Sequence, residues 1–244
     1  MPEPRTDLKD WKPVPPPEAS TLAGRWVTLE PLSAKKHGPA LWQAVDGHDE
    51  VWQWLADGPY ESEAALKEAL AGKETGTAAR FYAIVPATTG HAAGYASLMR
   101  IDTANGVIEV GNVLFSPQLQ RTPAATEAMF LMAQYVFEGL GYRRYEWKCN
   151  GLNGPSRRAA ERLGFSFEGV FHQHMVVKGK SRDTAWYAML DSEWPARKAA
   201  FASWLAESNF DSAGRQKRTL RSFGPLRQPQ RRRSDPLPEM TDRS

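Results

Sequence analysis

The stretches IEVGNVLF, at residues 108–115, and QRTPAATE, at residues 120–127, decide the fold of this chain. The first is an apolar run typical of a buried strand, and the second begins as a turn and continues as a helix. The first turn of that helix carries no bulky side chain, so unpaired backbone N–H groups are presented together there. Because helix starts of this kind bind phosphate, the two stretches predict an anion site where strand and helix meet.

The flanking sequence predicts a sheet covered by helices. Strands are expected at 25–29, 81–85, 93–100, 107–115, 144–150, 165–169, 174–177 and 184–190, and helices at 33–45, 49–55, 62–71, 123–140, 153–163 and after 192. The three strands between 81 and 115 are joined by short turns, which is typical of an antiparallel meander. Gly72 and Gly164 are expected to end helices. The order of elements indicates mixed α/β (α+β) layering.

The chain of 244 residues has the size of one domain with extensions. We expect a proline-rich arm at 1–23, the domain at 24–194, a C-terminal helix and cap at 195–220, and a basic, disordered tail at 221–244. Eight basic residues and no acidic residue lie between Arg215 and Arg233. Without them 23 basic residues stand against 28 acidic ones, so the domain itself is mildly acidic.

The single cysteine excludes an internal disulfide and a cysteine-rich metal site. Cys149 lies in an alternating strand pattern, where the role of a small buried hydrophobe is favoured over that of a reactive thiol. The first 20 residues are polar and proline-rich, unlike a secretory signal, and no stretch is long enough to span a bilayer. These features predict a soluble cytoplasmic protein with no membrane partner.

Several short motifs occur in a fixed order along the chain. They are EVG at 109–111, ATEA at 125–128, NGPS at 153–156, LGF at 163–165, EG at 168–169, RD at 182–183 and EW at 193–194. Together they resemble the GNAT superfamily of N-acetyltransferases, in particular its Rim-type branch related to ribosomal-protein acetyltransferases, over about residues 26–194. The resemblance implies a mostly antiparallel central sheet flanked by helices, with a splayed strand pair for acyl-CoA. It also implies acetyl-CoA as co-substrate and no metal.

The resemblance assigns the acetyl-CoA site to the opening stretches. Backbone groups of the strand would accept pantetheine, and the loop that follows would wrap the pyrophosphate. The implied residues are Val113, Leu114, Phe115, Gln120, Arg121, Thr122, Ala124, Ala125, Asn153 and Ser156. Arg121 and Pro123 replace glycines of the family pattern. We expect Thr122 to cap the helix with Pro123 at its first position, which leaves the N–H groups of Ala124 and Ala125 free for a phosphate.

Glu109 is the lone charge in its strand and the candidate general base, since an attacking amine must lose a proton. A glutamate on the solvated side of the strand, or one bonded to a nearby loop, would have the same sequence. Backbone N–H groups near Asn112 to Leu114 would stabilise the oxyanion. A tyrosine acid of some relatives corresponds to Ala160 here, so Ser156 is the replacement to test; its alternative role is a helix cap. Asn153 can bond pantetheine or simply start a helix.

Candidate acceptor residues lie late in the chain. His172 and His174 flank one residue of a strand and are expected to point the same way, where they could bind an acceptor, shuttle a proton or form half of a metal pair. Arg182 and Asp183 match a late pair of the family and could form an ion pair or line the acceptor pocket. Three tryptophans, Trp42, Trp52 and Trp54, are favoured as core over a substrate platform.

The sequence therefore predicts an N-acetyltransferase that moves an acetyl group from acetyl-CoA to a primary amine, by direct attack in a ternary complex. The amine would be a protein N-terminus or a small molecule. The alternative is a non-catalytic acyl-CoA-binding or polyanion-binding module with the same fold. The basic segment Arg215–Arg233 could contact RNA or the ribosome weakly, or be a solvated extension. Either a monomer or a homodimer is compatible with the sequence.

Overall fold

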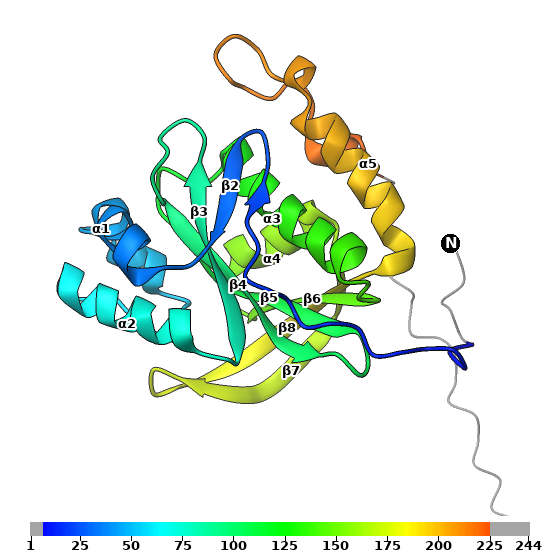
Figure 1. The fold of residues 1–244 in the computed structure, drawn as a ribbon, viewed down its shortest axis with the longest axis horizontal. Helices are drawn as coiled ribbons and strands as arrows, with labels where there is room; N and C mark the ends of the chain where they lie inside the picture. Colours follow the sequence, from blue (N-terminus) through cyan, green and yellow to red (C-terminus); the bar gives the residue numbers. More distant parts are fainter. Residues whose placement is uncertain (1–6, 225–244) are drawn as a thin grey trace, which may run out of the picture.

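A computed structural model describes residues 7–224 and shows a mixed α/β fold built on one eight-stranded sheet (Figure 1). The strands are β1 (Leu22–Ala23), β2 (Val27–Pro31), β3 (Ala79–Pro86), β4 (Gly94–Asp102), β5 (Val107–Phe115), β6 (Arg144–Asn150), β7 (Ser166–Val177) and β8 (Lys180–Leu190). Their order in the sheet is β1-β2-β3-β4-β5-β6-β8-β7. Every neighbouring pair is antiparallel except β5 and β6, which run parallel. The expected mostly antiparallel sheet is confirmed.

Helices cover both faces of this sheet. On one side lie α1 (Ala34–Val45) and α2 (Glu63–Thr75), linked through the 3₁₀ turn η1 (Asp49–Trp52). On the other lie α3 (Pro123–Gln134), which continues as the π-helical turn η2 (Tyr135–Gly139), α4 (Gly154–Leu163) and α5 (Trp194–Leu205), as Figure 1 shows. Three further 3₁₀ turns are η3 (Asp191–Glu193), η4 (Glu207–Asn209) and η5 (Leu220–Ser222). The sheet is thus the middle of three layers.

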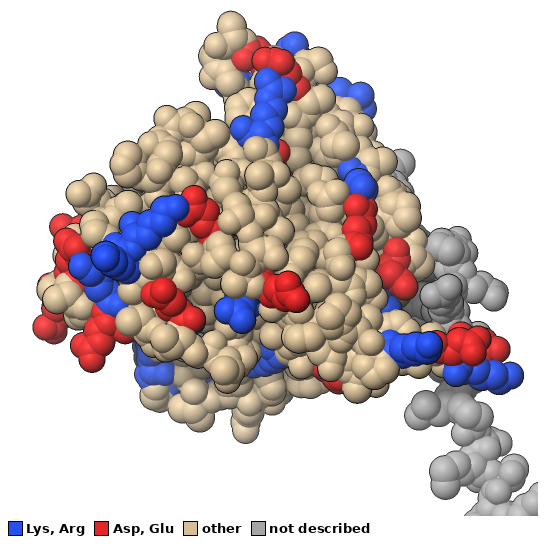
Figure 2. Space-filling model, in the orientation of Figure 1, with Lys and Arg blue, Asp and Glu red and all other residues tan. Residues whose placement is uncertain are grey.

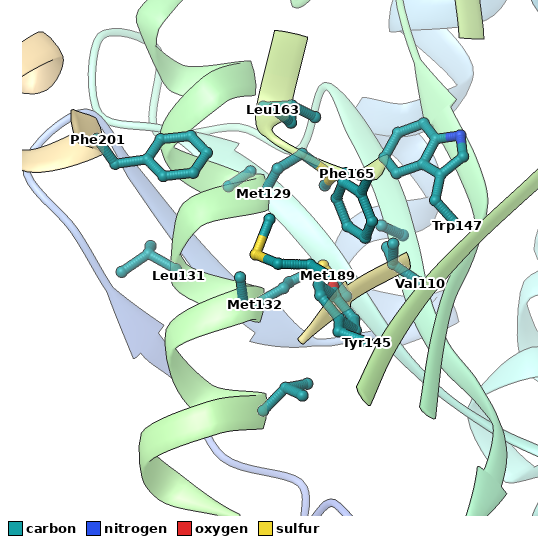
Figure 3. Packing of buried hydrophobic residues seen from close by; sticks show 14 of the residues in the cluster. Val110, Met129, Leu131, Met132, Tyr145, Trp147, Leu163, Phe165, Met189 and Phe201 are labelled. Atoms are coloured by element: carbon teal, nitrogen blue, oxygen red, sulfur yellow. The ribbon is translucent and has the colours of Figure 1, made fainter. Parts of the chain in front are cut away.

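Each helical layer encloses its own hydrophobic core. The larger core packs α3, α4 and α5 on the sheet, and Figure 3 shows Met129 and Met132 of α3 beside Val110 and Tyr145 of the sheet. The smaller core packs α1 and α2 on β3, β4 and the end of β5. Because side chains alternate along a strand, Ile108 and Val110 enter the larger core while Glu109 faces the opposite side. This alternation decides which residues can meet on each face.

Two expectations about the secondary structure were wrong. Gly72 does not end α2, which continues to Thr75 and stops at Gly76, whose N–H donates to the carbonyl of Gly72. One glycine inside a helix costs only about 1 kcal/mol, and the stable turns around it outweigh that cost. The two strands expected at 165–169 and 174–177 are one strand, β7, interrupted by a register shift between Phe171 and Met175.

The segments at both ends of the described chain lie on the domain. The N-terminal arm is fixed by the Trp11 indole, which donates to the carbonyl of Ala104 (2.7 Å), and by Tyr82, whose hydroxyl donates to the carbonyl of Glu18 (3.0 Å). After α5 the chain forms an ordered cap in which Leu220 is buried and the Phe210 ring lies 5.3 Å from that of Trp204. None of the helices within residues 7–224 has both the length and the apolar character needed to cross a membrane.

The basic segment is only partly within the described residues. Arg215 forms an ion pair with Asp211 (2.9 Å), the Arg218 guanidinium lies 4.2 Å from the Phe223 ring centre, and Arg221 lies 3.7 Å from Glu161. These basic residues therefore make contacts inside the chain. Residues 225–244, which include most of the predicted disordered tail, lie outside the described range. On the face drawn in Figure 2, acidic and basic side chains of the described residues alternate, and no broad patch of one sign extends over it.

Candidate active site

The parallel strands β5 and β6 separate partway along their length. They pair from Val107 with Arg144 to Val110 with Trp147, and then both continue without pairing to each other. Over the same length β5 remains bonded to β4, and β6 remains bonded to β8. An opening therefore forms between two strands in the middle of the sheet. Since buried backbone groups require partners, the free edge of β5 suits an extended ligand with amide groups.

A β-bulge in β5 accompanies this separation. Two residues of β5, Asn112 and Val113, stand between the Ser97–Gly111 and Tyr95–Leu114 pairs, where β4 has only one residue. Asn112 has φ of 49°, a left-handed conformation that asparagine tolerates better than most residues. Its side-chain amide donates to the Ser97 hydroxyl (3.0 Å), which fixes the bulge. A bulge bends its strand and increases its twist, and this one turns β5 away from β6.

The loop before α3 is closed by side-chain hydrogen bonds. The Thr122 hydroxyl donates to the carbonyl of Leu119 (2.7 Å) and accepts from the N–H of Ala125 (3.1 Å), so Thr122 is the predicted N-cap. The expectation that the Ala125 N–H is free was wrong, because the cap uses it. Only the Ala124 N–H remains of the two predicted donors. The Gln120 side chain donates to the carbonyl of Phe115 (3.1 Å), which joins the loop to the end of β5.

Arg121 has the backbone conformation for which the family pattern places glycine. Its φ is 62°, in the left-handed region that costs a residue with a Cβ about 1–2 kcal/mol. The side chain is exposed and makes no hydrogen bond or ion pair within the described part of the chain. Pro123 occupies the first turn of α3, where its missing N–H removes no helical bond. An unpaired guanidinium thus stands beside a helix start.

Glu109 is buried in a network of charges on the face opposite α3. It is 4% exposed, and its Oε2 accepts from Arg100 Nη1 (2.9 Å) and lies 3.0 Å from Lys148 Nζ. Lys148 also contacts Glu146 (2.6 Å), and Arg144 contacts Glu146 in turn (2.7 Å). Glu109 therefore lies neither on the solvated side of its strand nor in contact with a loop. Two cations compensate the charge of this carboxylate beside the opening.

Glu146 is the counterpart of Glu109 on β6. The two residues are register partners in the parallel pair. Burial alone would raise the pKa of Glu146, but hydrogen bonds from Lys148 and Arg144 outweigh it and hold that pKa below its ordinary value. The network therefore favours the ionised form of Glu146, while Glu109, its register partner, belongs to the strand that carries the bulge.

Ser156 and Asn153 lie at the start of α4. Asn153 is the N-cap, since its side-chain oxygen accepts from the N–H of Ser156 (3.0 Å). The Ser156 hydroxyl accepts from the Trp147 indole (3.0 Å), and it also bonds the Cys149 thiol, whose pKa burial raises. Ser156 thus lies next to β6 where β6 leaves β5. Cys149 is buried, as its alternating pattern predicted.

The two histidines do not act as the regular pair that strand alternation predicts. Gln173 between them has φ of 49° and lies within the register shift of β7, which breaks the alternation. His172 contacts Asp183 (2.8 Å), whereas His174 contacts the Thr184 hydroxyl (3.0 Å). A backbone hydrogen bond from Gln173, together with His172, lowers the pKa of Asp183.

Arg182 and Asp183 form no ion pair with each other in the described structure, because Asp183 is taken by His172. Of the three tryptophans, Trp52 is 2% exposed in the smaller core, as favoured from the sequence. A separate cavity between α1, η1 and α2 is lined by Trp42 and Trp52 and by no residue of β5, β6 or β8. Within residues 7–224 no three His, Cys, Asp or Glu side chains converge as metal ligands would.

Sequence reasoning did not single out Arg100, Lys148 and Trp186. The Lys148 ammonium lies 3.7 Å from the Trp186 ring centre and bridges both buried glutamates. Because side chains alternate along β6, Lys148 lies on the opposite face of the sheet from the apolar residues before and after it. The register between β5 and β6 could not be predicted, because parallel strands are joined by a long helical connection and no short turn between them fixes their alignment.

The architecture and the opening between two parallel strands define an acyltransferase-like protein. The family model described as Acetyltransferase (GNAT) domain matches residues 27–166. The chain belongs to the GNAT acetyltransferase family. It is 53% identical to a GCN5-related N-acetyltransferase from Brucella melitensis, whose structure superposes with a TM-score of 0.87 and covers 88% of this chain and 99% of that one.

Other relatives agree with this assignment. A probable GNAT acetyltransferase from Chromobacterium violaceum is 41% identical, with a TM-score of 0.74 and coverage of 79% of this chain and 98% of that one. The uncharacterized N-acetyltransferase YnaD of Bacillus subtilis is 26% identical over 63% of this chain and 89% of its own length. An acetyltransferase from Salmonella typhimurium, described as modifying the N-terminal serine of a 50S ribosomal subunit protein, shares the fold at 24% identity, with a TM-score of 0.60 over 70% of this chain and 99% of that one.

Proposed function

We propose that this chain transfers the acetyl group of acetyl-CoA to a primary amine by direct attack in a ternary complex. The observation that carries the proposal is the opening between β5 and β6, which begins after Val110 and coincides with the bulge at Asn112. The free edge of β5, at Val113, Leu114 and Phe115, would pair with the amide groups of pantetheine. The thioester would then lie between the bulge and β6.

The pyrophosphate would lie at the start of α3. The Ala124 N–H and the positive end of the helix would face it, and the exposed Arg121 would add a charge-assisted contact. Gln120 and Thr122 would hold the loop in place by bonding Phe115 and Ala125. Asn153 and Ser156, at the start of α4, would border the pantetheine from the side of β6.

Glu109, directly or through a water, would take a proton from the acceptor ammonium. The amine nitrogen then forms a bond to the thioester carbon, and the carbonyl π electrons move to its oxygen, which backbone N–H groups near Asn112 to Leu114 would stabilise. When the C=O bond re-forms, the C–S bond breaks and its electron pair leaves with the CoA thiolate. The second proton of the nitrogen is released, and the thiolate takes up a proton from Ser156 or solvent. The products are an N-acetyl amide and CoA.

Two measurements test this proposal. Calorimetric titration with acetyl-CoA should show saturable binding, and thiol release from acetyl-CoA should depend on added amine. Binding without thiol release against a broad panel of amines and short peptides would favour the alternative, a non-catalytic acyl-CoA-binding module. No detectable binding at high micromolar acetyl-CoA would contradict both. The cytoplasmic location, the oligomeric state and an RNA or ribosome contact through Arg215–Arg233 stay predictions.

A further inference from the structure

Arg182 is a half-buried cation whose donors have no partner in the described structure. Its Nε is inaccessible to solvent and unbonded, and the guanidinium makes no ion pair or hydrogen bond with any residue of 7–224. Burial lowers the pKa of Arg182, which reflects the cost of leaving this charge without a partner. Arg162 is comparably buried, yet it donates to the Thr126 hydroxyl (3.1 Å) and lies over the Trp204 ring. The N–H donors of Arg182 are therefore free to bind an anion.

Its position relates that capacity to the proposed reaction. On β8, Ala185 and Tyr187 enter the larger core, so Arg182 and Trp186 lie on the opposite face, which Glu109 shares. The charges of Glu109 and Arg100 act on the guanidinium. Arg182 pairs with Met175 of β7, beyond the last β6–β8 pair at Asn150 and Thr184, so it lies past the end of β6, where the gap between β5 and β6 is open, on the side of the sheet away from α3 and its loop.

The neighbouring cations are already neutralised. Arg100 contacts Glu109, and Lys148 contacts both Glu109 and Glu146. No carboxylate of residues 7–224 neutralises Arg182 in the same way. A guanidinium presents parallel N–H donors that match the two oxygens of a carboxylate. The missing partner is therefore an anionic group that a ligand brings to this face.

We propose that the acceptor amine carries a carboxylate near its reacting nitrogen and that Arg182 binds this carboxylate. The inference rests on the proposed function, since it assigns the acceptor to the face where Glu109 would act as base. A free α-amino acid and a peptide whose first or second residue is acidic both carry such a group. The Trp186 indole N–H, which is also buried without a partner, offers a further donor on the same face.

The test compares acceptors in pairs that differ only in charge. Amino acids are assayed against their amides, and peptides beginning Ser-Asp against those beginning Ser-Asn, by thiol release from acetyl-CoA. For the wild type we expect kcat/KM to favour the acid by about tenfold or more, as one charge-assisted contact provides. Arg182→Gln should remove this preference while leaving kcat/KM for the amides within about threefold and the acetyl-CoA Kd unchanged. Arg182→Lys keeps the positive charge but loses the paired N–H donors of the guanidinium, so it should retain part of the preference for acids.

Arg80→Gln is the matched control. Arg80 on β3 is also half-buried with an unbonded Nε, but it alternates with Phe81 and so lies on the face of the larger core. The Arg80→Gln variant should therefore leave the preference for acids intact. An equal loss for acids and amides in Arg182→Gln, or a wild type without acid preference, would overturn the inference. A loss confined to acetyl-CoA affinity would also overturn it and assign Arg182 to the donor.

A binding measurement separates this inference from the proposed function. The same acids and amides are titrated by calorimetry into the protein saturated with CoA. If no amine supports thiol release but acids still bind more tightly than amides, and Arg182→Gln abolishes the difference, the carboxylate site stands and the transferase proposal fails. If amines are acetylated but acids and amides bind equally, the transferase stands and the carboxylate site does not exist.

Discussion

The two sides of the β5–β6 opening are built from different materials. One part of the site consists mainly of backbone: a bulge fixed by Asn112, a free strand edge, and a helix start capped by Thr122. The other part, away from α3, consists of side-chain charges centred on Glu109 and Lys148. Backbone geometry recognises features that every acyl-CoA shares, whereas a set of charges can discriminate among acceptors. The difference indicates that the proposed donor site depends mainly on backbone geometry and the proposed acceptor site mainly on side-chain charges.

The largest expected effect comes from the charged side. Glu109→Gln should lower kcat by about 100-fold at neutral pH, because the variant cannot accept the amine proton. The acetyl-CoA Kd should change by less than about threefold, since donor binding depends on the other side. Steady-state thiol release and calorimetry measure the two quantities.

Glu146→Gln is the control for this variant. Glu146 is the register partner of Glu109 and shares Lys148 with it, so the replacement disturbs the same network without touching the proposed base. Equal losses in kcat for the two variants would mean that the network, and not Glu109, supports turnover.

A change on the backbone side should act on the donor. Asn112→Val places a β-branched residue at φ of 49° and removes the bond to Ser97, which should alter the bulge. If two pantetheine hydrogen bonds are lost at about 1 kcal/mol each, the acetyl-CoA Kd rises roughly 30-fold. Asn112→Gly keeps the backbone conformation and should affect the Kd much less. Similar affinities for the two variants would show that the bulge does not shape the donor site.

Arg121 permits a separation of charge from backbone strain. Both Arg121→Ala and Arg121→Gly remove the guanidinium and should raise the acetyl-CoA Kd by about two- to fivefold. Only Arg121→Gly relieves the strain of the positive φ, so its melting temperature should be higher than that of Arg121→Ala. A Kd unchanged in both variants would remove Arg121 from the donor site.

The smallest effect is a pH dependence of stability within the charged network. The folded-state pKa of Glu146 lies below its ordinary value, so its ion pairs stabilise the fold above that ordinary value, about 4.3. The stabilisation is lost as the pH falls through the lowered pKa. The difference in melting temperature between the wild type and Glu146→Gln should therefore be constant near pH 7 and shrink below about pH 4. A difference that grows on acidification would contradict this assignment.

Local patterns in the sequence were sufficient for most of the fold. The period of apolar residues and the caps at Ser33, Thr122, Asn153 and Gly164 predicted the main helices, because those signals act within a few residues. The strand 107–115 was predicted with the bounds that the structure shows. The single strand β7 could not be predicted, since its continuity depends on pairing with β8 across a register shift.

The candidate site was less accessible to sequence reasoning. Thr122 and Pro123 were predicted at their positions because capping is local. The use of the Ala125 N–H by that cap, the pairing of Asp183 with His172, and the unpartnered Arg182 all depend on contacts between side chains. Lys148 is the clearest case, since it bridges Glu109 and Glu146 only because β5 and β6 are parallel and in this register.

The central claim is that acetyl-CoA binds along the free edge of β5, and amide hydrogen exchange tests it most directly. Exchange is followed by mass spectrometry with and without saturating acetyl-CoA, with peptides that cover residues 111–115 and, for comparison, β3. Binding should slow exchange at 111–115 and at the start of α3 and leave exchange in β3 unchanged. Binding that leaves 111–115 unprotected, or that protects a different part of the described chain, would contradict it.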